Sequence, residues 1–216
     1  GTPYDMTRSI KSTDKEGKTI ISPLANPFMP YDQLDISNVS GGWYDVDKKS
    51  GKISFLGERT IARWYTMYAT IIQCRDWLPD EIGGVVWLAM DNVATSIYIP
   101  VYCSVTDLPK PYKTPGRPKG YTTESAWWAF NRLGTLTAQR WGEMRHDVDA
   151  VWVPWQNELF ENQKQIEEQA LKLYNSKKPE KTIEFVTKYT NDWGNKVVSK
   201  AWELGDFLWT KYDEKF

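Results

Sequence analysis

The residues best suited to nucleophilic chemistry are the two cysteines, Cys74 and Cys103, and the single histidine, His146. A cysteine nucleophile needs a base and surroundings that favour its thiolate form. Each cysteine lies in or beside an apolar stretch without a neighbouring histidine, and His146 lies in the charged segment Arg145-His146-Asp147. We therefore expect two small buried thiols and a solvated helical histidine; a nucleophilic thiol and a proton-shuttling histidine are the alternatives.

Acidic residues offer a second kind of chemistry, a pair of carboxylates acting as general acid and base. The candidates Asp76, Asp80, Glu81 and Asp91 all lie in segments typical of loops. Acidic side chains in such segments usually form turns or cap helices. No spacing singles out one pair, so we interpret these residues as turn formers and caps. Neither the cysteines nor the histidine have a spacing typical of a metal site or a disulfide framework.

Arg59 is the most informative basic residue because it precedes a strand that demands burial. Its guanidinium must reach a carboxylate, a carbonyl or solvent in a cleft. An ion-pair anchor at the start of the strand and a role in a catalytic cleft both satisfy this requirement. Arg63 and Arg75 follow the same logic.

The elements that position these residues change character along the chain. Residues 1 to about 58 are rich in proline and glycine, with a turn at Lys48–Lys52 between short strands around Trp43–Val46 and Ile53–Leu56. The alternation over 60–73 and the apolar run over 85–90 predict strands that are covered on both faces. The segment 96–102 forms an antiparallel hairpin with 85–90, and Pro100 places it at an edge or a bulge.

After a proline-rich link at Pro109–Pro118, the apolar period changes from two to about 3.6. Helical spacing follows from Trp127 to Leu136, then over about 144–175 with a kink or restart at Pro154, and over about 180–212 after Pro179. Strands followed by helices predict an α+β fold.

Composition excludes several classes of protein. The 216 residues carry a net charge of −1, which gives no basic footprint for nucleic acid, and no apolar run is long enough for a membrane span. The twelve tryptophans are spread from Trp43 to Trp209, which favours an aromatic core. The alternative is a non-catalytic glycan- or peptidoglycan-binding module that stacks sugars on exposed tryptophans such as Trp127 and Trp128, with Tyr121 nearby.

Spaced motifs along nearly the whole chain resemble the dipeptidase A family of cysteine peptidases, which are N-terminal-nucleophile hydrolases. They comprise Gly1-Thr2-Pro3-Tyr4-Asp5, the loop Pro23–Pro27, Arg59, Gln73, Arg75, Trp77-Leu78-Pro79, Ile82-Gly83-Gly84, Trp87, Tyr98, Pro100, Tyr102-Cys103-Ser104, Pro109 and Ser125-Ala126-Trp127-Trp128-Ala129-Phe130. The resemblance implies a four-layer αββα sandwich in which two stacked sheets lie between layers of helices. It also implies a peptidase that cleaves short peptides without a cofactor or metal.

In such enzymes the first residue of the mature chain supplies an attacking thiol and its own α-amine acts as the base. Gly1 has no side chain. The resemblance therefore implies that residues 1–216 form the C-terminal segment of a single αββα domain, inactive without an upstream segment that carries the nucleophile. Within it we expect irregular loops and short strands over 1–58, core strands over 59–108 and helices over 119–216.

The resemblance also suggests roles for two residues of this chain. Arg59 is the expected catalytic residue near the missing thiol, and Asp5 is expected to order a substrate-binding loop at the cleft. The expected partners are a dipeptide or short-peptide substrate and the missing N-terminal part of the same protein, with self-association as the alternative. The compartment is left open, with a lean towards an extracytoplasmic location in a bacterium.

Overall fold

The computed structural model describes residues 11–21, 44–46, 49, 53–55 and 66–215. Two short antiparallel hairpins precede the main body: β1 (Lys11–Thr13) pairs with β2 (Thr19–Ile21), and β3 (Tyr44–Val46) pairs with β4 (Ile53–Phe55). The predicted strands on either side of Lys48–Lys52 are confirmed. The β1–β2 hairpin was not predicted. Its turn is closed by Asp14, whose side chain accepts hydrogen bonds from the backbone N–H groups of Glu16 and Lys18.

The main sheet is an antiparallel meander of three strands, β5 (Tyr68–Cys74), β6 (Gly84–Met90) and β7 (Ile99–Tyr102), in that spatial order. The predicted hairpin of the last two strands is confirmed, and Pro100 lies in β7 at an edge of this sheet. The strand predicted over 96–102 begins only at Ile99. A single turn of 3₁₀-helix, η2 (Val93–Thr95), takes up the connection, and Asn92 caps it by accepting the N–H of Ala94.

The strand predicted over 60–73 is shifted towards the C-terminus. Residues 60–65 lie outside the described part of the chain, Thr66 and Met67 are not in a strand, and β5 continues to Cys74. A short helix, α2 (Asp80–Gly83), connects β5 to β6. The backbone N–H of Arg75 donates to the carbonyl of Gly83 at 3.0 Å, which closes the hairpin between the two strands.

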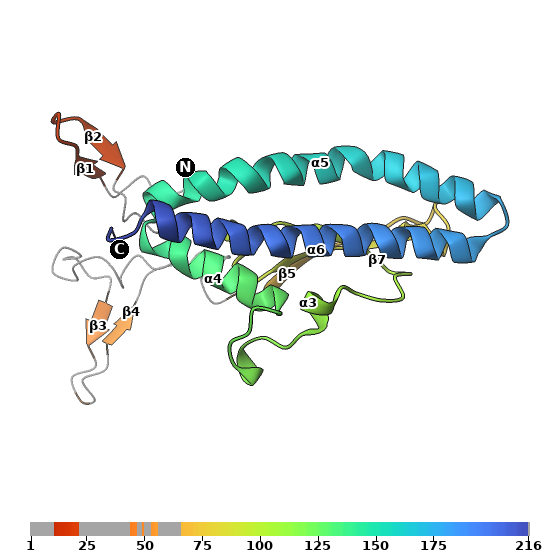
Figure 1. Ribbon diagram of the computed structural model, residues 1–216, viewed down its shortest axis with the longest axis horizontal. Helices are drawn as coiled ribbons and strands as arrows, with labels where there is room; N and C mark the ends of the chain where they lie inside the picture. The colour runs from red at the N-terminus through yellow and green to blue at the C-terminus, as the bar shows by residue number, and fades with distance from the viewer. Residues whose placement is uncertain (1–10, 22–43, 47–48, 50–52, 56–65, 216) are drawn as a thin grey trace.

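The C-terminal half consists of α4 (Ala126–Gln139), α5 (Trp141–Asn175) and α6 (Pro179–Lys211), preceded by two short turns of helix, α3 (Lys110–Lys113) and η3 (Arg117–Lys119). Figure 1 shows α5 and α6 running side by side along the length of the sheet, with α4 beside α6. Pro179 occupies the first turn of α6, as predicted. The predicted restart at Pro154 is wrong, because α5 is a single helix and the proline lies on its exposed side.

The core lies between the sheet and these helices. Alternate residues of β6 point into it, and Val85, Trp87 and Ala89 are at most 2% exposed. The inward side of α6 is formed by a stripe of buried residues that continues the half-buried Ile183: Val186, Trp193, Val197, Ala201, Leu204 and Leu208. The α+β class predicted from the order of elements is therefore correct.

The opposite face of the same sheet differs from the prediction. Its strands were expected to be shielded on both sides, but within the described residues α4, α5 and α6 cover one side only. On the other side Tyr68 is 62% and Ile72 is 66% exposed, although both are large and apolar. We call this side the outer face; by strand register it consists of Tyr68, Thr70, Ile72, Cys74, Gly84, Val86, Leu88, Met90 and Val101, together with Ile99, which is itself buried at 1% exposure. A second stacked sheet is not among the described residues.

A membrane-spanning helix is not found in the described part of the chain. The longest helices, α5 and α6, carry charged residues along their exposed sides.

Candidate functional site

Both cysteines lie at one end of the outer face, on either side of Gly84. Cys74 is the cross-strand partner of Gly84, and the N–H of Cys103 donates to the carbonyl of Gly84 at 2.9 Å. A β-carbon on Gly84 would lie only 2.7 Å from the sulfur of Cys103, so the missing side chain makes room for this thiol. The prediction of buried thiols is wrong. Both cysteines are exposed, because they lie at strand ends on the side of the sheet that the helices leave open.

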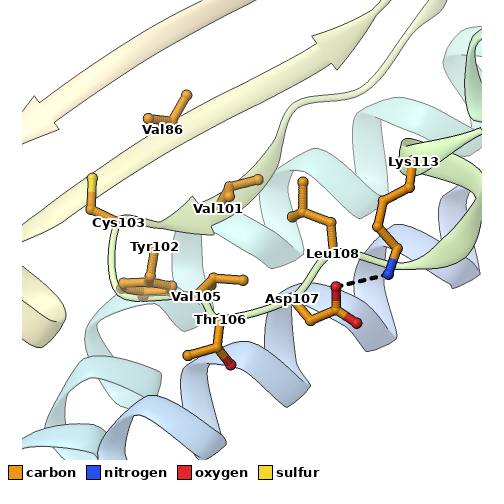
Figure 2. A pocket seen from close by; sticks show the side chains of 9 residues that line it. All are labelled: Val86, Val101, Tyr102, Cys103, Val105, Thr106, Asp107, Leu108 and Lys113. Carbon is orange, nitrogen blue, oxygen red and sulfur yellow. Dashed lines mark hydrogen bonds and ion pairs between the residues drawn. The ribbon is translucent and has the colours of Figure 1, made fainter. Parts of the chain in front are cut away.

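Next to Cys103 the outer face is hollowed into an open pocket of about 420 Å³ (Figure 2). Its wall is mostly apolar, and Val86 and Val101 project into it from neighbouring strands. The rim carries one ion pair, in which Lys113 donates to Asp107 at 2.8 Å. The lining residues are Val86, Val101, Tyr102, Cys103, Val105, Thr106, Asp107, Leu108 and Lys113. Such a pocket suits a small apolar group.

The pocket has no base for the thiol among its lining residues. The hydrogen bond from Lys113 holds the pKa of Asp107 below its ordinary value, so this carboxylate is a poor proton acceptor. His146 is exposed on α5, as predicted. It lies 21 residues before Glu167, which bonds to the residue after Cys74, and this separation corresponds to about 30 Å along the helix. The described residues therefore contain no Cys-His pair, and they contain no cluster of His, Cys, Asp or Glu suited to a metal ion.

Arg75 lies beside this end of the sheet and is held by three acceptors. Its guanidinium forms an ion pair with Glu167 of α5 and donates to the carbonyls of Ile82 and Gly83. The two charged side chains are only 11% and 13% exposed. The prediction that the Arg75 guanidinium must reach a carboxylate or a carbonyl is confirmed. Its role is to fasten the β5–β6 connection to α5.

Glu167 extends this contact into a polar network behind the sheet. It also accepts hydrogen bonds from Gln163 at 3.0 Å and from the hydroxyl of Tyr102 at 3.3 Å. Burial and the charge of Glu167 raise the pKa of Tyr102 well above its ordinary value, so the phenol stays protonated as the donor. The side-chain oxygen of Gln73 accepts from both Gln163 and the indole of Trp87. The network thereby sets the register of α5 against all three strands of the main sheet.

The two residues given site roles by resemblance lie outside the described part of the chain. These are Arg59, the expected catalytic residue, and Asp5, the expected substrate-binding residue. Arg63 lies outside it as well. The roles of Arg59 near the missing thiol and of Asp5 in a loop at the cleft stay predictions.

The tryptophan pair named as a possible sugar-stacking site lies mostly in the core. Trp127 is 5% exposed, and the half-buried Trp128 donates its indole N–H to the carbonyl of Gly120 at 2.7 Å. Tyr121 meets the ring of Trp128 edge-on, with ring centroids 5.4 Å apart. The two most exposed tryptophans of the described chain are Trp77, at 74%, and Trp209, at 54%. Trp77 precedes α2, which packs near the start of α6, whereas Trp209 lies near the end of that helix, so the two do not form one platform.

The burial of Asp91 is a feature of the site that the sequence did not predict. Asp91 was interpreted as a turn former and does lie in the turn after β6, but it is 2% exposed and its backbone φ is +58°. Burial raises the pKa of its carboxyl to about 6. Aspartate is one of the few residues that tolerate this left-handed conformation. An aspartate directly after a buried strand therefore indicates a turn, but it does not indicate that the carboxyl is buried.

Comparison with known families bears directly on the motifs around the sheet. The model of Peptidase family C69 matches residues 27–153, which include the whole main sheet and α4. The chain belongs to Peptidase family C69. This is the dipeptidase A family that the motifs resemble, and membership makes the protein a hydrolase of the cysteine peptidase class. No curated protein matches the chain. The C69 match ends within α5, so most of α5 and all of α6 lie beyond the matched residues.

Proposed function

We propose that this chain is the later part of a C69 dipeptidase, which hydrolyses short peptides with a thiol supplied by an upstream segment of the same protein. In this proposal the first residue of the mature enzyme provides the nucleophile and its α-amine provides the base. The thiol attacks the amide carbonyl, the amine leaves with a proton, and water releases the acyl group. The 216 residues by themselves are then inactive.

One observation carries the proposal. The chain belongs to a family of cysteine peptidases, but neither of its thiols has a general base beside it among the described residues. Cys74 and Cys103 are exposed at the ends of the sheet, and the described histidine is about 30 Å distant along α5. This arrangement supports a nucleophile that is supplied by the upstream segment. An N-terminal cysteine meets the need for a base within the same residue.

The outer face supports the proposed architecture. Exposed apolar residues on a central sheet mark a surface that another layer covers. We propose that this layer is the second sheet of an αββα sandwich, contributed by the rest of the protein, and that residues 1–216 are one segment of that single domain. Packed sheets lie about 10 Å apart and interdigitate through such residues. The preferred occupant is thus the upstream part of the same protein, with self-association of this chain as the alternative.

Arg59 and Asp5 complete the proposed site. Arg59 would place a guanidinium near the attacking thiol, where it stabilises negative charge on the substrate or the oxyanion. Asp5 would order a loop at the entrance of the cleft. Both side chains belong to the motifs that led to the family.

The test is a dipeptide hydrolysis assay on the full-length enzyme with its upstream thiol intact. Replacing that thiol with alanine should abolish turnover, whereas a Cys74→Ala/Cys103→Ala double variant should retain it. Arg59→Ala should reduce kcat without unfolding the protein, and the exposed Lys188→Ala serves as the matched control. Full activity without the upstream thiol, or loss of activity in the double cysteine variant, would overturn the assignment.

A non-catalytic glycan-binding module is the competing proposal. It requires several tryptophans exposed on one face, and quenching of tryptophan fluorescence by acrylamide measures this exposure. A mostly shielded signal supports a core role. Strong quenching that is relieved by a peptidoglycan fragment would favour the module.

A further inference from the structure

The junction between the β6–β7 turn and α4 contains a buried carboxyl that has no close cationic partner among the described residues. Asp91 follows the last residue of β6 and is 2% exposed. Its backbone N–H donates to the carbonyl of Met67 at 2.8 Å, which connects the turn to the residue before β5. Its φ of +58° directs the side chain towards α4 instead of continuing the strand.

The carboxyl meets α4 at two positions. Its Oδ1 accepts from the side-chain amide of Asn131 at 3.1 Å. Its Oδ2 lies 3.4 Å from the point where a β-carbon on Gly134 would stand, and the hydroxyl of Thr95 lies 3.0 Å from the same point. The absent side chain of Gly134 therefore lets α4 approach the turn closely enough to bury the carboxyl.

The groups around Asp91 stabilise a buried negative charge only weakly. The side chain of Asn131 and the backbone N–H of Asn92 are neutral donors that favour the charged form only in part. Among the described residues, Arg117 of η3 is the charged group whose field reaches the carboxyl, and its effect is the smallest of those that act on it. Arg132, adjacent to Asn131 in α4, is engaged elsewhere, since it donates to Asp206 at 2.7 Å.

We propose that Asp91 is a proton-binding site that fastens the β6–β7 turn to α4, and that this junction is most stable when the carboxyl is protonated. The direction of this pH dependence follows from the burial of the carboxyl. Desolvation disfavours the carboxylate and raises its pKa from 3.8 to about 6 in the folded chain. A raised acid pKa means that the folded state binds the proton more tightly than the unfolded state. The stabilisation is therefore complete below about pH 4 and is lost as the pH rises through 6.

The experiment compares the full chain with its Asp91→Asn variant over pH 4–7.5. Asparagine tolerates a positive φ and keeps an oxygen for Asn131, but it never carries the charge. We expect the folding equilibrium constant of the variant relative to wild type to rise on the order of 100-fold from pH 4 to pH 7.5. Asp107→Asn is the matched control, because that carboxyl is exposed and its pKa is lowered. For this control the same ratio should not rise with pH.

A direct titration keeps the proposal testable if the variant folds poorly. In carbon-13 NMR spectra of the wild-type full chain, the Asp91 carboxyl should titrate near pH 6, far above the other aspartates. A midpoint near pH 4, or a stability difference between wild type and Asp91→Asn that does not vary with pH, would overturn the proposal.

Discussion

The two faces of the main sheet have similar sequences but very different surroundings. The face towards the helices holds Val85, Trp87 and Ala89, which are almost inaccessible to solvent. The outer face holds Tyr68 and Ile72, which are mostly exposed, although nothing in their residue types distinguishes them from core residues. The residue types of the two faces therefore do not predict which face the described helices cover. A second layer on the outer face, as proposed above, would account for its apolar residues.

The two faces also differ in the contacts that the described residues make. The inner face is fixed by a continuous aromatic and aliphatic core together with the Arg75–Glu167 network. The outer face has a pocket and two thiols, and β5 has no second partner strand among the described residues. Substitutions on the two faces should therefore differ in their effects on stability.

The largest effect is expected for a matched pair of phenylalanines. Phe130 is 1% exposed within the core, whereas Phe160 is 50% exposed on α5 beside the ring of Trp87. Phe130→Ala should lower the free energy of unfolding by about 3–5 kcal/mol, because it opens a cavity in a packed core. Phe160→Ala should cost about 1 kcal/mol, mostly from one edge-on ring contact. Urea denaturation measures both, and equal losses would contradict the contrast.

A slightly smaller effect is expected at the polar network. Glu167→Ala leaves the guanidinium of Arg75 buried without its carboxylate, which should cost about 3 kcal/mol. The adjacent Glu168 is exposed, and Glu168→Ala should change the unfolding free energy by less than about 0.5 kcal/mol. Chemical denaturation of both variants tests this pair. A loss below about 1 kcal/mol for Glu167→Ala would show that solvent reaches Arg75 and replaces the ion pair.

The outer face itself provides the sharpest test of the proposed second layer. In the 216-residue chain, Ile72→Thr should change the unfolding free energy by about 0.5 kcal/mol or less, because this side chain is mostly exposed. Val85→Thr buries a hydroxyl in the core and should cost about 2 kcal/mol. In the full-length enzyme Ile72→Thr should become as costly as Val85→Thr. If Ile72→Thr stayed neutral there, the outer face would have no covering sheet.

The smallest effect is expected at a surface ion pair on α6. Lys188 donates to Asp192 one helical turn away, and both side chains are largely exposed. Lys188→Ala should cost about 0.3–0.5 kcal/mol, and the loss should disappear at high salt. A loss that persists in molar salt would indicate that Lys188 contributes through packing.

Much of the fold could be predicted from local patterns. α4 lies where the helical spacing from Trp127 predicts it, α6 begins at Pro179, and the β6–β7 hairpin follows from two apolar runs with a short connection. The interior of α5 could not be predicted in the same way. A proline inside a helix usually interrupts it. Pro154 instead lies on the solvent side of α5, and the packing of the helix turns before and after it keeps the helix continuous.

The candidate site could be predicted less well, because its features depend on tertiary packing. The burial of Asp91 results from the approach of Gly134 and Asn131, which lie about 40 residues later in the sequence. The exposure of Cys74 and Cys103 depends on which face the helices cover, and strand periodicity does not determine that choice. The Arg75 prediction succeeded because a buried guanidinium has to find acceptors wherever it lies.

The order of elements along the chain has a consequence for biosynthesis. Thr190 of α6 donates to the carbonyl of Pro100, so the last long helix shields the final strand of the sheet. Ribosomes add about 5–20 residues per second, so β7 leaves the exit tunnel roughly 5–20 s before all of α6 is available. During that interval the strands of the nascent polypeptide expose apolar residues on both of their faces. A chaperone that binds exposed apolar segments of nascent chains should therefore improve the yield of soluble protein from cell-free translation.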